Sequence, residues 1–284
     1  MISIFVMYST DRSDALSHTI SCLKDMKLYD KCQKTLVVDG KIDRIPSDWQ
    51  AIQIPRNSNG FCWGRMWDAG VYSARYEKIV YLDSDRLMPE NYLNIVNEKI
   101  DDDVFIFTSK HFLMLEALPI QTCKDLLKMP EIETSLIMPN YIGRFKYEVR
   151  HQFPFHGPGK NVMSGSVAFN KKTYNKLGGV DHWYCGHGAF ADSDFHMQAS
   201  VAGCNFIDLE IPELHYPHKK IDNNTILNEK KLYYMGLDNF IYYCKKWNLP
   251  MKLADGLAER CGESRPSKYV DNRLKEIMAI SKEF

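Results

Sequence analysis

Two aspartates that flank a serine, Asp83-Ser84-Asp85, are the residues of this chain best placed to do chemistry. They follow the apolar run 78–82, which predicts a buried strand that ends before Pro89. Because side chains alternate faces in extended backbone, positions 83 and 85 are expected to project the same way. Two such carboxylates repel each other unless water screens them or a cation lies between them. A hard divalent ion favours these oxygen ligands and can hold diphosphate oxygens as well, although a lone Asp-x-Asp is more simply interpreted as an acidic turn.

The elements before these aspartates alternate between the two kinds of secondary structure. Strands are expected at 2–8, 34–38, 51–54 and 78–82, and helices at 13–27 and 62–76. This alternation predicts an α/β fold in which helices cover the faces of a parallel sheet. Ligands of such sheets bind beyond the carboxyl ends of the strands, and Asp39 and Asp83 both lie at such ends.

The rest of the chain is less regular. Helices are expected at 91–99, 172–177 and 192–202, and strands at 104–108, 161–169 and 205–209. Residues 117–160 carry five prolines and are expected to be irregular, either as an acceptor surface or as a structural insertion. From 226 onward the pattern is helical, with aromatic residues expected in a core, and the polar segment 265–284 is expected to pack weakly or to bind a partner.

Composition narrows the class of protein. The 284 residues suit one large domain, alone or with an appendage. Lys plus Arg equals Asp plus Glu at 36 each, so no global field attracts nucleic acid or an anionic membrane. The apolar N-terminal stretch is too short to span a bilayer and follows no basic segment, so neither a signal peptide nor a transmembrane anchor is expected. The 8 cysteines form no Cys-x-x-Cys pair, which favours reduced thiols in a cytosolic protein over a cysteine-built zinc site.

Three further segments carry residues that could belong to a site. Gly165 lies in a run of small residues at 163–168, where backbone could approach a ligand closely. The pair Asp192 and Asp194 begins a predicted helix, where one carboxylate can cap the helix and the other can act as a general base. His215 follows a predicted strand, and it is either an ordinary surface residue or the ligand that completes an octahedral site for manganese or a similar ion.

The order of these features resembles the GT-A glycosyltransferases, in particular family 2-like enzymes and the galactosyltransferase-type C-terminal module. The resemblance rests on Val38-Asp39, on Tyr81-Leu82-Asp83-Ser84-Asp85, and on Gly178-Gly179-Val180-Asp181 followed by Ala191-Asp192-Ser193-Asp194. It covers residues 1–220, which implies a GT-A domain with a Rossmann-like, nucleotide-sugar-binding mixed sheet flanked by helices. Residues 221–284 would then be a helical C-terminal extension.

The resemblance also implies a donor site. Asp39 would hydrogen-bond the nucleotide base, and Asp83 would contact the ribose or a metal-bound water. Asp85 would ligate Mn²⁺ or Mg²⁺ together with His215. The remaining donor-site residues implied are Tyr8, Ser9 and Thr10, which would line the nucleoside pocket, and Ser84 within the acidic motif.

For the acceptor side, the resemblance implies that Asp192 is the general base of an inverting transfer from a UDP-linked sugar to a hydroxyl of a glycan or another acceptor. The other substrate-site candidates are Trp183, His187, Gly165, Asp194 and His218, of which His218 also competes with His215 for the metal. Two departures stand out: Ala191 replaces the family's Glu, and Trp67-Asp68-Ala69-Gly70 replaces Arg-Asn-x-Gly. They leave the acceptor and the details of nucleotide binding open.

Three alternatives remain at this stage. Nucleotidyl transfer is disfavoured because residues 8–14 contain neither glycine nor lysine. A non-catalytic protein that binds carbohydrate or nucleotide-sugar is compatible with Ala191. A glycosyltransferase that modifies nucleic-acid bases is disfavoured by the balanced charge, although the lysine pairs at 219–220, 230–231 and 245–246 could form a basic face. The expected location is cytoplasmic, with peripheral membrane association left open, as are the donor sugar and the oligomeric state.

Overall fold

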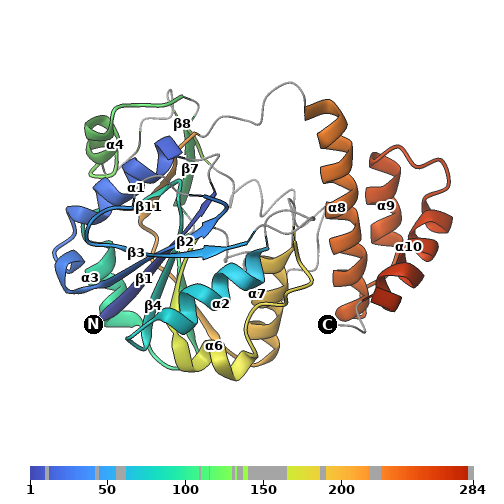
Figure 1. The fold of residues 1–284 in the computed structure, drawn as a ribbon, viewed down its shortest axis with the longest axis horizontal. Coiled ribbons are helices and arrows are strands. Elements are labelled where there is room, and N and C mark those ends of the chain that lie inside the picture. Colours follow the sequence, from blue (N-terminus) through green and yellow to red (C-terminus); the bar gives the residue numbers. More distant parts are fainter. Residues whose placement is uncertain are drawn as a thin grey trace. The chain divides into compact units, whose positions relative to one another are not determined.

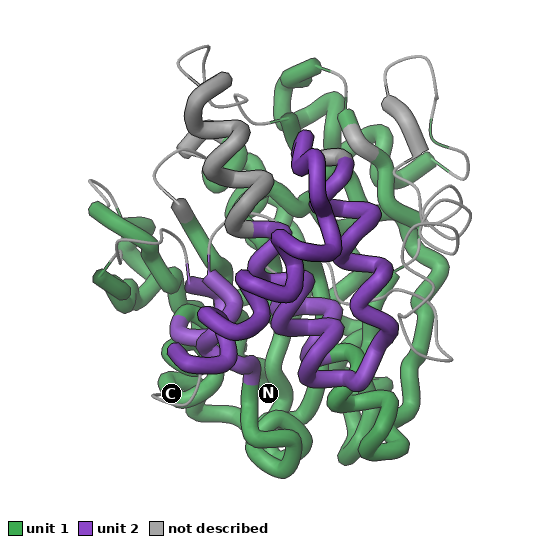
Figure 2. Tube along the Cα trace, turned by 90° about the vertical axis from the view of Figure 1, so that its right-hand side faces the viewer, with its two compact units in different colours: residues 1–55, 66–179, 196–220 green, residues 56–65, 180–195, 221–284 purple. Residues whose placement is uncertain are grey.

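The computed structural model describes residues 1–9, 13–41, 45–55, 62–108, 110–114, 116–129, 132, 137–139, 165–185, 190–217 and 225–280. The chain divides into two compact units, which Figure 2 colours separately. Unit 1 comprises Met1–Pro55, Met66–Gly179 and His196–Lys220, and unit 2 comprises Arg56–Arg65, Val180–Phe195 and Ile221–Phe284. The division into a domain at 1–220 and an extension at 221–284 stays a prediction.

Unit 1 is built on a seven-stranded sheet with the order β10-β6-β9-β4-β1-β2-β3, of which Figure 1 labels β1 to β4. Its strands are β1 (Ile2–Ser9), β2 (Gln33–Asp39), β3 (Gln50–Ile54), β4 (Lys78–Asp83), β6 (Val104–Phe107), β9 (Ser166–Asn170) and β10 (Asn205–Asp208). All neighbours pair in parallel except β9, which runs antiparallel to both β4 and β6. The sheet is therefore mixed, as the resemblance implied. The parallel arrangement expected from the first ninety residues is confirmed for β1, β2, β3 and β4, and the sheet becomes mixed only through β9, which lies between β4 and β6.

Alternating side chains explain how helices cover both faces of this sheet. On one face, Ile4, Val6 and Leu82 are buried in a cluster with residues of α1 (Ser13–Lys24) and α3 (Tyr92–Lys99). On the other face, aromatic rings of the sheet, including Phe5 and Phe169, pack against α2 (Trp63–Ser73) and α6 (Lys171–Leu177). Helix α2 lies so close that a Cβ at Gly70 would come within 2.4 Å of the Phe5 ring.

A second sheet of unit 1 has four strands in the order β5-β11-β7-β8. These are β5 (Arg86–Leu87), β11 (Pro212–His215), β7 (Lys110–Met114) and β8 (Ile137–Pro139). None of them was predicted. Strand β8 and helix α4 (Ile120–Leu126) lie within the segment 117–160, so the expectation that all of it is irregular is wrong. A short 3₁₀ helix, η2 (Tyr29–Lys31), completes the elements that belong wholly to unit 1.

Three helices make up most of unit 2: α8 (Thr225–Lys246), α9 (Lys252–Arg260) and α10 (Pro266–Ile280). Phe240 of α8 is buried, as the prediction of a core role for the aromatic stretch requires. Helix α10 buries Val270 and Ile277, and Arg273 ties it to α8 by donating from Nε to Asp238 Oδ1 at 3.0 Å and from Nη2 to Oδ2. The polar C-terminal segment is thus anchored by an ion pair as well as by apolar packing.

Helix α7 (Ala191–Val201) carries the second acidic pair near its beginning, with residues up to Phe195 in unit 2. None of the described helices combines the length and the apolarity that a membrane-spanning segment needs.

Candidate functional site

Strand register brings three predicted donor-site positions to one edge of the large sheet. Ser9, the last residue of β1, pairs with Asp39, the last residue of β2, and Met7 pairs with Asp83 on the other side of β1. Asp39 and Asp83 therefore flank the carboxyl end of β1, where ligands of such sheets bind. The Tyr8 ring is buried in the cluster beneath α1, so Tyr8 itself can offer only backbone at this edge, and Thr10 lies outside the described residues.

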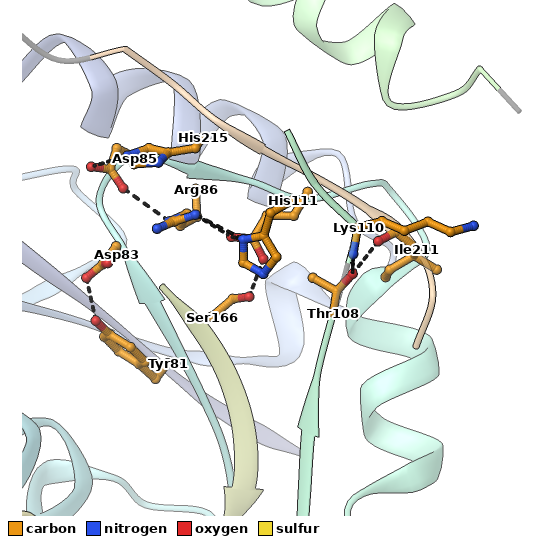
Figure 3. A network of polar contacts seen from close by, with 11 residues as sticks. Tyr81, Asp83, Asp85, Arg86, Thr108, Lys110, His111, Ser166, Ile211 and His215 are labelled. Carbon is orange, nitrogen blue, oxygen red and sulfur yellow. Dashed lines mark hydrogen bonds and ion pairs between the residues drawn. The ribbon is translucent and has the colours of Figure 1, made fainter. Parts of the chain in front are cut away.

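Asp83 and Asp85 lie in different backbone conformations. Asp83 ends β4, whereas Ser84 and Asp85 form a turn, so the assumption of extended backbone through position 85 is wrong. Asp83 accepts a hydrogen bond from the hydroxyl of Tyr81, two residues earlier on the same strand face (Figure 3). Burial and the charge of Asp83 raise the pKa of Tyr81 well above its usual value, so the phenol remains a donor.

Ser84 is fixed by its backbone. Its N–H donates to Met7 O at 3.1 Å, and its carbonyl accepts from Thr19 Oγ1 at 2.8 Å. The hydroxyl Oγ is fully buried and has no hydrogen-bond partner among the described residues. Since buried polar atoms are rarely left unsatisfied, this hydroxyl is a feature that a ligand or water would complete.

The turn leads into a largely buried group of polar and charged side chains that we call the Arg86 cluster: Asp85, Arg86, His111, Ser166, Glu213 and His215, all but Glu213 labelled in Figure 3. Its arrangement follows from the register of the small sheet. Glu213 and His215 lie two residues apart on β11 and so share a face, while Arg86 pairs with His215 and His111 pairs with Glu213. Four polar side chains from three strands thereby meet on one side of a sheet.

Direct contacts hold the Arg86 cluster together. Arg86 Nη1 donates to Glu213 Oε1 at 3.1 Å and lies 3.1 Å from His111 Nδ1. Glu213 also accepts from the Ser166 hydroxyl. Arg86 Nε lies 3.5 Å from Asp85 Oδ1, and the carboxyl groups of Asp85 and Glu213 are both completely buried.

The charge balance of the cluster is uneven. Burial lowers the pKa of Arg86, but Glu213, Asp85 and Asp83 together raise it above its usual value, so the guanidinium stays charged. Burial lowers the pKa of His111, which keeps this imidazole neutral near pH 7. Arg86 is thus one fixed cation beside two buried carboxyl groups, an arrangement that a further cation would complement.

His215 is the member of the cluster that is partly exposed, so a cation would approach from its side. His215 Nε2 is 3.4 Å from Asp85 Oδ2, and its side chain is 19% exposed, whereas that of Asp85 is not exposed at all. A carboxylate oxygen and an imidazole nitrogen suit Mn²⁺ or a similar ion, so the donor types fit. Among the residues that the structure describes, no group of three or more His, Cys, Asp or Glu side chains is placed to hold a metal. The further ligands of an ion held here would come from a bound molecule and from water.

Gly165 has a role inside the protein. Its φ is +84°, and a Cβ there would come within 2.3 Å of Arg86 Nε and 2.4 Å of its Cζ. Its carbonyl accepts from Asp83 N at 2.7 Å. The close approach that the small residues allow is therefore an approach of the Arg86 guanidinium to the backbone that precedes β9.

The second acidic pair differs between its two members. Asp192 is half-buried, its Oδ1 accepts from Ser193 N at 2.8 Å, and burial raises its pKa. Asp194 is completely buried and accepts from Tyr184 at 3.1 Å, from Lys246 at 2.8 Å and from the Trp247 indole at 2.7 Å.

We call this second group the Asp194 cluster: Asp181, Tyr184, Asp194, Tyr242, Lys246 and Trp247. Lys246 Nζ lies 2.8 Å from carboxylate oxygens of both Asp181 and Asp194. Asp181 also accepts from Tyr242 at 3.0 Å and from Trp183 N at 2.9 Å. Although burial raises the pKa of Asp181, Lys246 and the other donors lower it below its usual value. The cluster therefore joins the segment before α7 to the end of α8.

The remaining candidates are partly described. The Trp183 ring stacks on Tyr242, with ring centroids 4.9 Å apart, so one of its faces is already covered. His187 and His218 lie outside the described residues. The two departures from the family occupy core positions: Ala191 is 2% exposed, and Trp67, also 2% exposed, stacks on Phe169.

Sequence reasoning missed Arg86, His111, Ser166 and Glu213 as members of a site. The alternation in Pro212-Glu213-Leu214-His215 could have indicated that Glu213 shares a face with His215. No local signal marks His111, because its place in the cluster depends on the pairing of β7 with β11, about a hundred residues apart in sequence.

No family model matches this sequence, and no curated protein matches it either. Among solved structures, TarS 1-349 from S. aureus is similar over 98% of this chain and 70% of its own, with a TM-score of 0.50 and 11% identity. The complex of TarS 1-349 with UDP is similar over 100% of this chain and 72% of its own, with a TM-score of 0.50 and 12% identity. The mannosyltransferase PcManGT from Pyrobaculum calidifontis, in complex with GDP-Man and Mn²⁺, is similar over 99% of this chain and 75% of its own, with a TM-score of 0.52 and 14% identity. At these identities the likeness shows the fold, and it confirms the predicted GT-A-type mixed sheet flanked by helices.

Proposed function

We propose that this chain is a glycosyltransferase that moves a sugar from a nucleotide-diphosphate donor, UDP-linked, to an acceptor hydroxyl. The observation that supports it most is the convergence at one sheet edge of Asp39, Asp83 and the Asp85–His215 pair. These groups offer what such a donor needs: polar partners for a nucleoside and a negatively charged pair that suits a divalent ion. The same fold occurs in a mannosyltransferase structure that contains GDP-Man and Mn²⁺.

In the proposed donor site, Asp39 bonds the base and Asp83 contacts the ribose or a metal-bound water, while residues 8–10 line the nucleoside. Asp85 and His215 would hold Mn²⁺ or Mg²⁺. The ion, when bound, would neutralise charge on the leaving diphosphate, an effect of several kcal/mol. Arg86 fixes Asp85 from the side away from His215, since it contacts Oδ1 while His215 contacts Oδ2.

For the acceptor step, we assign Asp192 as the base that takes the proton of the attacking hydroxyl, which gives inversion at the anomeric carbon. Its half-buried carboxylate has a raised pKa, and a base of this kind is expected to contribute about 10²–10⁴ in rate. Asp194 supports this role indirectly, because its three donors hold the first turn of α7. Trp183, His187, Gly165 and His218 remain candidates for the substrate side.

The test is nucleotide release from a panel of UDP- and GDP-sugars, with Mn²⁺ and with EDTA, followed by mass analysis of any glycosylated product. We expect release from one donor that requires the metal, and NMR of the product should show inverted anomeric configuration. A carbohydrate-binding or nucleotide-sugar-binding protein would retain the donor and release no nucleotide. Binding without release in the presence of every acceptor offered would therefore reject the proposed activity.

An acceptor on nucleic acid is not favoured. Of the lysines that could form a basic face, Lys246 points into the Asp194 cluster, where it pairs with two carboxylates. A cytoplasmic location remains a prediction that fractionation of the cell would test.

A further inference from the structure

Unit 2 brings two cysteines together that no part of the proposed transfer uses. Cys62 and Cys185 form an isolated antiparallel β-bridge, although 122 positions separate them in sequence. Residues opposite each other in antiparallel pairs have Cα atoms about 4.5 or 5.5 Å apart, depending on the type of pair. Both values fall within the range of about 4.4–6.8 Å that disulfides span. The backbone therefore already has the spacing that a disulfide requires, while both thiols are reduced in this structure.

The side chains converge as well. Cys62 Sγ and Cys185 Sγ both donate to the same acceptor, the carbonyl oxygen of His182, at 3.7 Å and 3.6 Å. Two thiols that share one acceptor are neighbours, and both are directed to the same side of the bridge. No rearrangement of distant segments is needed to bring the sulfurs together.

Close packing holds this geometry in place. A Cβ at Gly64 would come within 3.0 Å of the carbonyl oxygens of Val180 and Asp181, so the segment after Cys62 lies directly on the segment before Cys185. On the other side, Asn239 Nδ2 donates to Cys185 O at 3.0 Å and fixes this backbone to α8. The pair thus belongs to a tightly packed part of unit 2.

The two thiols differ in reactivity. When Cys62 is ionised, the Cys185 thiol donates to it instead of to His182 O, and this hydrogen bond lowers the pKa of Cys62 to about 6 in spite of burial, with further help from Arg65 and His182. At neutral pH Cys62 is therefore largely thiolate, the nucleophilic form of the side chain. Cys185 is partly exposed, whereas Cys62 is 6% exposed, which admits a small oxidant but hinders a large one.

We propose that Cys62 and Cys185 are a hydroperoxide-sensitive dithiol, in which Cys62 is oxidised first and Cys185 resolves it to a disulfide. The Cys62 sulfur attacks one oxygen of hydrogen peroxide, the O–O bond breaks, and hydroxide leaves, so that Cys62 becomes a sulfenic acid. The Cys185 sulfur then attacks Cys62 Sγ, the S–O bond breaks, and the departing oxygen leaves as water with the Cys185 proton. In sum, two thiols lose two electrons and two protons, and one hydrogen peroxide is reduced to two waters.

The same chain contains a matched control pair. Cys22 and Cys123 pack in one apolar cluster of unit 1, and both are almost completely buried. Burial raises the pKa of Cys22 to about 12 and that of Cys123 to about 11. Two neighbouring cysteines without thiolate character should resist peroxide, because the thiolate is the reactive form.

The experiment treats the reduced full-length chain with hydrogen peroxide at pH 7, alkylates the remaining thiols, and maps disulfides by peptide mass spectrometry. We expect one Cys62–Cys185 crosslink, reversed by dithiothreitol, with two of the 8 cysteines protected from alkylation. Cys185→Ser should stop at a sulfenic acid on residue 62 that dimedone traps. Cys62→Ser should slow thiol loss at least about tenfold, and Cys123→Ser should behave as wild type.

A second measurement keeps the proposal testable if Cys62→Ser fails to fold. The rate at which iodoacetamide modifies Cys62 in the wild-type chain should rise with pH to a plateau and be half-maximal near pH 6, and Cys185→Ala, which removes the hydrogen-bond donor, should move this midpoint upward. Crosslinking of Cys22 to Cys123 instead, thiol loss without any Cys62–Cys185 crosslink, or a wild-type midpoint at the ordinary cysteine value would each overturn the proposal.

Discussion

The tripeptide Asp-Ser-Asp occurs twice in this chain, at 83–85 and at 192–194, and the two copies have different surroundings. The first follows a strand and enters a turn, whereas the second lies in the first turn of a helix. In both, the second aspartate is completely buried beside a cation, Arg86 for Asp85 and Lys246 for Asp194.

The two buried aspartates nevertheless differ in their suitability for binding a ligand. Asp194 accepts three hydrogen bonds within 3.1 Å, from an ammonium, an indole and a phenol, which is what a structural anchor needs. Asp85 has a looser contact with Arg86, at 3.5 Å, and directs its other oxygen toward a partly exposed histidine. The comparison teaches that the donors around a carboxylate, more than the motif that contains it, decide whether it can serve a ligand.

The largest effect should come from removing the anchor. Asp194→Ala would remove a buried carboxylate that accepts three hydrogen bonds, from Tyr184, from the partly exposed ammonium of Lys246 and from the Trp247 indole, so we expect a loss of about 3–5 kcal/mol in the free energy of unfolding. Asp192→Ala, its neighbour in the same tripeptide, loses a single short-range bond and should cost about 1 kcal/mol. Urea unfolding measures both, and equal losses would contradict the distinction between anchor and base.

At the first tripeptide, we expect the substitution of the second aspartate to affect activity instead of stability. Asp85→Ala should reduce metal-dependent turnover about 10³-fold, which corresponds to about 4 kcal/mol of lost stabilisation in the transition state. Nucleotide release at a series of Mn²⁺ concentrations measures this, and circular dichroism checks that the variant is folded. If Asp85→Ala turns over normally with saturating Mn²⁺, Asp85 is not a metal ligand.

A smaller effect should appear in the pH dependence of activity. A base must be deprotonated to act, and burial raises the pKa of Asp192, so kcat/KM should fall as the pH drops through a value above the usual aspartate pKa of about 3.9. Residual activity of Asp192→Asn should lack this acid limb. An acid limb that persists unchanged in the variant would assign it to another group.

The smallest effect is the expected difference in stability between alanine substitutions at two glycines, Gly165 and Gly178, which both have a φ of +84°. Gly178→Ala meets no atom within 4 Å and should cost only the strain of a left-handed alanine, about 1 kcal/mol. Gly165→Ala also collides with the Arg86 guanidinium and should cost about 1–3 kcal/mol more. Thermal unfolding of the two variants provides the comparison, and identical melting temperatures would show that Arg86 moves aside without cost.

Much of the fold could be predicted because most strands of the large sheet contain apolar runs, which are local signals. Apolar runs located the six strands β1, β2, β3, β4, β6 and β10, and apolar residues spaced by three and four located α1 within a few residues. The small sheet was missed, since β5 has only two residues and β11, which alternates apolar and polar residues, lacks the apolar run that located the equally short β6 and β10.

The sequence likewise predicted only those residues of the candidate site that follow a recognisable strand. Asp39, Asp83 and Asp85 follow strands that sequence reveals, whereas His111 and Glu213 meet Arg86 only through long-range pairing. The burial of Asp194 was also hidden, because two of its donors, Lys246 and Trp247, lie some fifty residues downstream.

The two-residue period of β11 has an evolutionary consequence. Glu213 and His215 reach the Arg86 cluster because they lie two residues apart, and therefore on the same face, of a strand only four residues long. A deletion of one residue between β10 and β11 that kept the strand pairing would rotate both side chains to the opposite surface and bring Leu214 into the polar network. Divergent descendants of this sequence should therefore tolerate substitutions at 209–211 far better than single-residue changes in the length of that connection.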